Sequence, residues 1–130
     1  MKIKEIAELV GAEIISGQAE NTGCDSIEVK QCYSADLMSD VLAFVKPGTL
    51  LLTGLTTPQV VYTAESAGIS VVCFVRGKKP HGDIVNLAKE KEIVLLATKN
   101  SMFEGCGRLY KNGLIGCYDS SKHESFGSQM

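Results

Sequence analysis

Three short polar segments, each at the end of an apolar run, carry residues that could bind a ligand or take part in chemistry. The first segment is Thr53–Thr57. It carries three threonine hydroxyls and a glycine directly before Pro58, a residue typical of a first helical turn. Free backbone N–H groups at a helix start, together with hydroxyls, can hold an anion. A tight turn followed by a capped helix has the same composition, so both interpretations stay open. The candidate ligand residues are Thr53, Gly54, Thr56 and Thr57.

The second segment, Arg76–His81, has the densest positive charge in the chain. An arginine side chain can bind a phosphate or a carboxylate through two parallel hydrogen bonds. A basic loop exposed to solvent is the alternative interpretation. The cations are too few to form a nucleic-acid surface on a chain whose net charge is −2. Arg76, Gly77 and Lys78 are the candidate ligand residues here.

A third segment, Thr98–Ser101, occupies the same position after an apolar run. Asn100 or Ser101 can cap the helix that follows it, which is the alternative to a binding role. If the three segments meet in space, they can hold a small anionic ligand, but the sequence does not decide whether they meet. Thr98 and Ser101 are its candidate ligand residues.

Ser34, Asp36 and Asp40 surround the start of another predicted helix. We expect the Ser34 hydroxyl to cap this helix and Asp36 to lie near the positive end of its dipole. A hydroxyl and two carboxylates can form a catalytic set, but no histidine or lysine adjoins them as a base. We therefore favour binding over catalysis for these three residues and predict no catalytic residue.

The five cysteines are odd in number and include no CxxC pair, which is typical of free thiols in a reducing compartment. We predict that Cys73, within an apolar run, and Cys106, in a helical apolar stripe, belong to the core. The others remain candidates for a redox-sensing thiol: Cys24, Cys32 and Cys117. The two histidines lie far apart without a second ligand nearby, so we predict no metal site and no cofactor.

The elements that must position these residues follow from apolar periodicity. Five strands are predicted, over residues 12–16, 26–33, 49–53, 70–75 and 93–97. Helices alternate with them; the one after Ser34 has an apolar stripe of Leu37, Val41 and Val45, with Met38 and Leu42 beside it. Buried strands that alternate with helices predict a largely parallel sheet in a three-layer α/β/α fold. In such sheets ligands bind beyond the carboxyl ends of the strands, where the candidate segments lie.

Length and composition limit the classes of protein. The 130 residues, of which 45% are hydrophobic, fit one α/β domain, over residues 1–116. The stretch 117–130 is polar and aperiodic, which predicts a mobile tail. No apolar run approaches the roughly 20 residues that span a bilayer. Glu5 and Glu8 interrupt the apolar pattern of residues 1–10, so we do not expect this segment to be a signal peptide. We expect a cytoplasmic protein without a membrane or nucleic-acid partner.

Two runs of sequence, Tyr33–Ala43 and Lys46–Thr53, resemble the DRTGG domain. Further similarity lies in Ala67-Gly68-Ile69, in Val75–Pro80 and in the stretch from Ser101 to Tyr110. The resemblance covers residues 1–116 and is closest to short stand-alone members, which occur in anaerobic bacteria beside iron-hydrogenase subunits. The naming motif itself is replaced here, by Gly54-Leu55 or the nearby Thr56-Thr57 and by Val75-Arg76-Gly77.

The resemblance implies a fold like the N-terminal domain of HPr kinase/phosphorylase and a homodimer. It also implies a non-catalytic regulatory or assembly module that binds a small anionic ligand or a partner protein, such as an iron-hydrogenase or another metabolic enzyme. Kinase activity is not carried over, because the chain has no GxxxxGK[ST] run to hold phosphates. Two alternatives stay open: a small enzyme acting on a phosphorylated or acidic metabolite at the strand-end loops, and a cysteine-based redox-responsive accessory factor.

Overall fold

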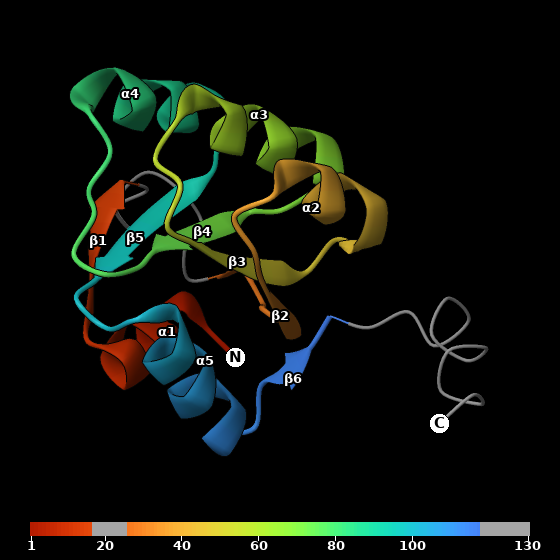
Figure 1. Cartoon of the computed structure of the whole chain (residues 1–130), viewed down its shortest axis with the longest axis vertical. Helices are drawn as coiled ribbons and strands as arrows, with labels where there is room; N and C mark the ends of the chain where they lie inside the picture. The colour runs from red at the N-terminus through yellow and green to blue at the C-terminus, as the bar shows by residue number, and fades with distance from the viewer. Residues whose placement is uncertain (17–25, 118–130) are drawn as a thin grey trace.

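A sheet with the strand order β1-β5-β4-β3-β2-β6 runs through the computed structural model (Figure 1). The structure describes residues 1–16 and 26–117, so Cys24 and residues 118–130 of the predicted tail lie outside the described residues. The strands are β1 (Ala12–Ser16), β2 (Gln31–Ser34), β3 (Thr49–Thr53), β4 (Val71–Phe74), β5 (Val94–Thr98) and β6 (Ile115–Gly116).

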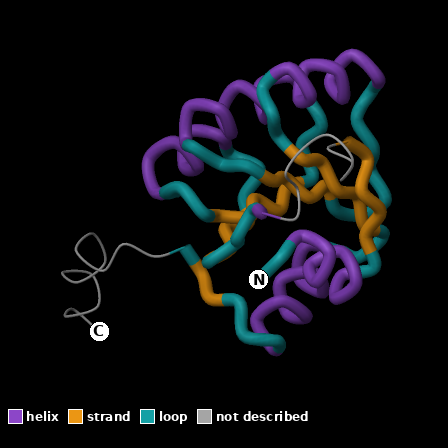
Figure 2. The backbone as a smooth tube through the Cα atoms, turned by 180° about the vertical axis from the view of Figure 1, so that it is seen from behind, coloured by secondary structure: helices purple, strands orange, loops and turns teal. Residues whose placement is uncertain are grey.

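Helices cover both faces of this sheet, as Figures 1 and 2 show. One face carries α1 (Ile3–Val10) and α5 (Met102–Lys111), and the other carries α2 (Met38–Phe44), α3 (Pro58–Ala67) and α4 (Gly82–Glu90). The predicted three-layer α/β/α fold with a largely parallel sheet is confirmed. No described helix is both long and apolar enough to cross a bilayer.

The sheet differs from the prediction at its edges. β1 pairs antiparallel with β5, an arrangement common for an edge strand of an otherwise parallel sheet. β6 adds a sixth strand beside β2, although it has two residues and no readable alternation. β2 is shorter than the predicted strand 26–33 and is shifted toward the carboxyl end, because its pairing with β3 covers residues 31–34.

The central strands are buried on both faces, as predicted from their continuous apolar runs. Every residue of β3, β4 and β5 is buried. Successive side chains alternate between the two layers. Leu50 and Leu52 join the cluster beneath α1 and α5, whereas Leu51 packs in the cluster beneath the other helices.

One predicted helix start is wrong, and another is right in position but lacks the capping hydrogen bond. Ser34 does not cap a helix, because it pairs with Leu52 as the last residue of β2, and the Ala35 amide extends that ladder to the Leu52 carbonyl at 3.1 Å. α2 begins at Met38 instead. Thr57 does occupy the position before α3, with Pro58 in the first turn, but its side chain makes no capping hydrogen bond.

The predicted apolar stripes are also corrected. In α2, Met38 and Val41 are buried, but Leu42 is 55% exposed, and Leu37 before the helix is 61% exposed. A seven-residue helix presents only two positions to the sheet, so the rest of the stripe has nothing to cover it.

The buried face of α5 is narrow as well. Phe103 and Tyr110 are 84% and 75% exposed, while Gly105 and Leu109 take the buried face. A Cβ on Gly105 would lie 3.0 Å from Leu52 Cδ2, so the missing side chain lets α5 approach the sheet closely. Phe103 and Tyr110 lie outside this contact and are exposed to solvent.

Candidate functional site

The three polar loops meet at the carboxyl edge of β3, β4 and β5. Their backbones are hydrogen-bonded to one another, so they form one connected surface. The bonds run from Val75 N to Thr53 O (3.1 Å), from Arg76 N to Asn100 O (2.8 Å) and from Gly77 N to Thr98 O (2.9 Å). The convergence that the sequence left open is therefore present in the structure.

Asp36 reaches the same edge from the end of β2. Its Oδ1 accepts a hydrogen bond from the Gly54 amide at 2.7 Å and another from the Thr53 hydroxyl at 3.0 Å. The Gly54 bond is the largest cause that holds the pKa of Asp36 below its usual value, against a smaller desolvation effect. The Thr53 hydroxyl and the charges of Arg76 and Lys78 lower this pKa further. Asp36 is thus an ionised group fixed to the β3–α3 loop.

Arg76 lies over Gly54, directly beside this carboxylate. A Cβ on Gly54 would lie 2.8 Å from Arg76 Nη2 and 3.6 Å from Asp36 Oδ1. Glycine at this position therefore leaves the space that the guanidinium occupies. Arg76 itself has a φ of 61°, a conformation that costs a non-glycine residue about 1–2 kcal/mol. The backbone N–H groups of Arg76 and Gly77 are already bonded, so a bound anion would meet side chains rather than these amides.

Two cations at this edge make no ion pair within the described part of the chain. Arg76 and Lys78 are both exposed, and neither side chain lies within ion-pair distance of a described carboxylate. Lys79, by contrast, pairs with Glu13 across the edge of the sheet. With Asp36 counted, the charged groups of the cluster sum to a positive charge, which favours an anionic ligand.

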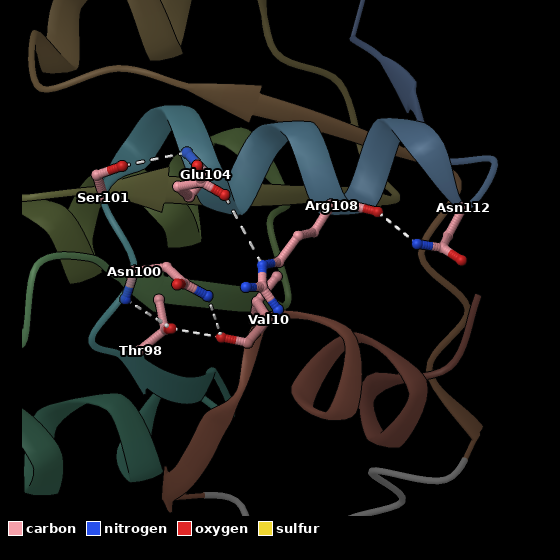
Figure 3. Close-up of polar contacts among 7 residues, drawn as sticks. All are labelled: Val10, Thr98, Asn100, Ser101, Glu104, Arg108 and Asn112. Carbon is pink, nitrogen blue, oxygen red and sulfur yellow. Dashed lines mark hydrogen bonds and ion pairs between the residues drawn. The ribbon is translucent and has the colours of Figure 1, made fainter.

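The polar side chains of Thr98, Asn100 and Ser101 already make hydrogen bonds within the protein (Figure 3). The buried Thr98 hydroxyl donates to Val10 O at 2.5 Å and accepts from Asn100 N at 3.1 Å, while Asn100 Nδ2 donates to Val10 O at 2.7 Å. Ser101 caps α5 by accepting from the Glu104 amide at 3.1 Å. Their position at the edge is as predicted, but their polar groups face the protein.

The remaining candidates divide between several places. Thr56 is half-buried and Thr57 is exposed where α3 begins, next to the cluster of Asp36, Gly54 and Arg76. Asp40 lies in the first turn of α2 and acts on Tyr33, whose pKa is raised mainly by burial and then by this charge.

Ser34 is separate from the cluster, because it opens onto a groove between α5 and the β2–β6 edge. It shares this groove with Cys32 and Cys106. The predicted assignment of Cys106 to the core is therefore only half right, since its side chain is partly exposed, whereas Cys73 is fully buried as predicted. The signal that was missed is the spacing of Cys32 and Ser34, which puts both on one face of a strand.

Comparison with known proteins gives a likeness of fold. No family model and no curated protein match the sequence. A solved structure does match: the CBS and DRTGG domains of the regulatory region of Clostridium perfringens pyrophosphatase, complexed with the activator diadenosine tetraphosphate. The TM-score is 0.69 at 16% sequence identity, and the match covers 83% of this chain but only 45% of that chain. The fold is therefore shared with a DRTGG-containing regulatory region, in keeping with the resemblance seen in the sequence.

Proposed function

We propose that this chain is a non-catalytic regulatory module that binds a small phosphorylated ligand at the carboxyl edge of its sheet. The observation that carries the proposal is the guanidinium of Arg76, held over Gly54 by the converged loops and without an ion-pair partner among the described residues. The similar structure is a regulatory region bound to a nucleotide activator, which supports a ligand of this class.

The arrangement suits a phosphate for electrostatic reasons. The Asp36 carboxylate receives the Gly54 amide and the Thr53 hydroxyl, so much of its charge is compensated within the loop. Arg76 and Lys78 then face solvent together, as a planar donor and a mobile ammonium. Charge-assisted hydrogen bonds from such groups are about twice as strong as neutral ones.

The experiment is a calorimetric titration of the purified chain with diadenosine tetraphosphate, ATP, pyrophosphate and uncharged adenosine. We expect the phosphorylated compounds to bind and adenosine to bind weakly or not at all. Arg76→Gln should weaken binding about tenfold or more, equivalent to about 1.4 kcal/mol. The matched control is Lys89→Gln, at an exposed lysine on α4 away from the loops. Equal affinity of Arg76→Gln and the parent chain would contradict the proposal.

A small enzyme acting on the same ligand remains the competing function. Recovery of the ligand intact after prolonged incubation with the protein, analysed by chromatography, is the expected result. Stoichiometric release of phosphate that Asp36→Ala abolishes would favour the enzyme instead, because Asp36 is the carboxylate nearest the two cations.

A specific observation favours a homodimer as the second part of the proposal. Leu37, Leu42 and Phe44, on and beside α2, are 61%, 55% and 38% exposed, and apolar side chains that form one exposed patch mark protein contacts. Light scattering should give a dimer mass for the parent chain and a monomer mass for Leu42→Asp. A monomeric parent chain would remove this part of the proposal and leave the ligand site intact. The resemblance makes a metabolic enzyme the partner to test next.

A further inference from the structure

Two cysteines that are distant in the sequence face each other where α5 packs against β2. Cys32 lies in the middle of β2 and Cys106 in the middle of α5. Both side chains are partly buried against the same core cluster, and both are free thiols. Both residues line the same groove, and each thiol is the largest influence on the acidity of the other.

The fold brings this pair together through one close contact. Gly105 touches the sheet at Leu52, the residue that pairs with Ser34 in the neighbouring strand. Cys106 is the next residue of the helix, so it is carried down onto the β2 edge. Cys32 and Ser34 are two positions apart in β2 and project from the same face, which lets Cys106 interact with both.

Solvent reaches the pair through the groove between α5 and the β2–β6 edge. This groove has a volume of about 380 Å³, and Cys32, Ser34 and Cys106 form part of its lining. Phe103, Tyr110 and Ile115 also line it and are 84%, 75% and 62% exposed. The space is large enough to admit a small organic molecule whose apolar part contacts these side chains.

The two thiols differ in acidity. The hydrogen bond from Cys32 is the main cause that lowers the pKa of Cys106 to about 6, against the opposing effect of burial, and the Ser34 hydroxyl lowers it further. The pKa of Cys32 is raised, first by Cys106 and then by burial, with smaller effects of the Cys73 and Cys117 charges. A thiolate that solvent can reach, next to a protonated thiol, is the arrangement of an attacking and a resolving cysteine.

We propose that Cys106 and Cys32 form a two-cysteine redox site that reacts with low-molecular-weight disulfides entering the groove. The Cys106 thiolate attacks one sulfur of the small disulfide, which breaks its S–S bond and releases one thiolate. That thiolate takes up the Cys32 proton. Cys32 then attacks the Cys106 sulfur and releases the second thiolate, which takes up from solvent the proton that Cys106 had lost. Two protein thiols lose two electrons and become the Cys32–Cys106 disulfide, and the small disulfide is reduced to two thiols.

Cys73 and Cys117 are the matched comparisons for this pair. Cys73 lies on the same face but is fully buried, and burial is the main cause that raises its pKa to about 12. Cys117 is partly exposed, and its sulfur accepts from the Thr49 hydroxyl at 3.5 Å and donates to the Phe44 carbonyl at 3.7 Å. Neither residue lines the groove, so neither should react as Cys106 does.

The test treats the whole chain with glutathione disulfide at pH 7 and maps the products by mass spectrometry. We expect loss of two hydrogens and a crosslinked peptide pair containing Cys32 and Cys106. Cys32→Ser should stop at a stable mixed disulfide on Cys106, and Cys106→Ser should give neither product. Cys117→Ser should behave as the parent chain. Circular dichroism confirms that each variant is folded, and Cys32→Ala replaces Cys32→Ser if the latter is not.

A second readout needs no variant. The alkylation rate of Cys106 by iodoacetamide should rise with pH to half its maximum near its pKa of about 6, while Cys73 stays unreacted in the folded protein. A crosslink between any other pair of cysteines, or no oxidation together with Cys106 alkylation no faster than that of Cys117, would overturn the proposal.

Discussion

The Asp36 carboxylate accepts the amide hydrogen of Gly54 at 2.7 Å, although the two residues are 18 positions apart in the sequence. This bond ties the end of β2 to the loop after β3, and Arg76 lies against the same glycine. Gly54 therefore contacts both the carboxylate that ties the loops together and the guanidinium that is proposed to bind the ligand. Substitutions at Asp36, Gly54 and Arg76 should distinguish the stability of the fold from the binding of the ligand.

Replacing Asp36 by alanine should destabilise the fold by about 1 kcal/mol at pH 7, since two hydrogen bonds to an ionised but exposed carboxylate are lost. Urea denaturation at pH 7 measures the change. Asp40→Ala is the control, because no hydrogen bond joins the Asp40 carboxylate to another described residue.

The difference in stability between the parent chain and Asp36→Ala should depend on pH. The pKa of Asp36 is lower in the folded chain than in the unfolded one, so its contribution is complete above its unfolded value of 3.8 and is lost as the pH falls through the folded value. The stability difference between parent and Asp36→Ala should shrink when unfolding is measured at decreasing pH below 4. A constant difference across that range would show that the charge is not what stabilises the contact.

Gly54→Ala should separate the position of Arg76 from overall stability. The new methyl group would meet Arg76 Nη2, the flexible end of a side chain, so the guanidinium moves at a stability cost of about 1 kcal/mol or less. Affinity for pyrophosphate should fall nearly as far as in Arg76→Gln. Gly82→Ala, in the first turn of α4 with no neighbour within 4 Å, should leave affinity unchanged and should not destabilise the fold. Unchanged binding by Gly54→Ala would mean that the guanidinium need not lie over this glycine.

Arg76→Gly should be more stable than the parent chain by about 0.5–1 kcal/mol, because glycine adopts a φ of 61° without strain. It should also lose ligand binding. Glu92→Gly is the matched control, because Glu92 also has a positive φ, 58°, and follows the carboxyl end of α4. This variant should gain stability and keep its affinity for the ligand. Thermal denaturation and calorimetry measure the two properties. A loss of stability in Arg76→Gly would show that its side chain stabilises the fold.

Two glycines of α5 should respond with opposite signs to the same substitution. Gly105→Ala forces a methyl group against Leu52 and should destabilise by about 1–3 kcal/mol. Gly107→Ala meets nothing within 4 Å and should stabilise the helix by about 0.5–1 kcal/mol. Equal effects in urea denaturation would contradict the close contact between α5 and the sheet.

The sequence predicts the centre of this fold better than its edges. Leu50–Leu52 is a continuous apolar run, and burial on both faces follows from composition alone. Ser34 is predicted to cap a helix but is the last residue of β2. Its place in the strand depends on pairing with Leu52, which the local sequence pattern does not reveal. The link between Asp36 and Gly54 is equally non-local. Cys32 is a redox candidate from the sequence, but its place beside Cys106 is not predicted, because Gly105 determines how closely α5 approaches the sheet, a packing effect absent from periodicity.

The most direct test of the proposed ligand site is a titration of the isotope-labelled chain with pyrophosphate, followed by amide NMR. The account predicts saturable shifts concentrated at Gly54, Arg76 and Lys78, with none at the Cys106 groove. In Arg76→Gln the same shifts should need about tenfold or more pyrophosphate, while the rest of the spectrum stays unchanged. Saturable shifts centred on another surface, or no shifts at millimolar pyrophosphate, would contradict it.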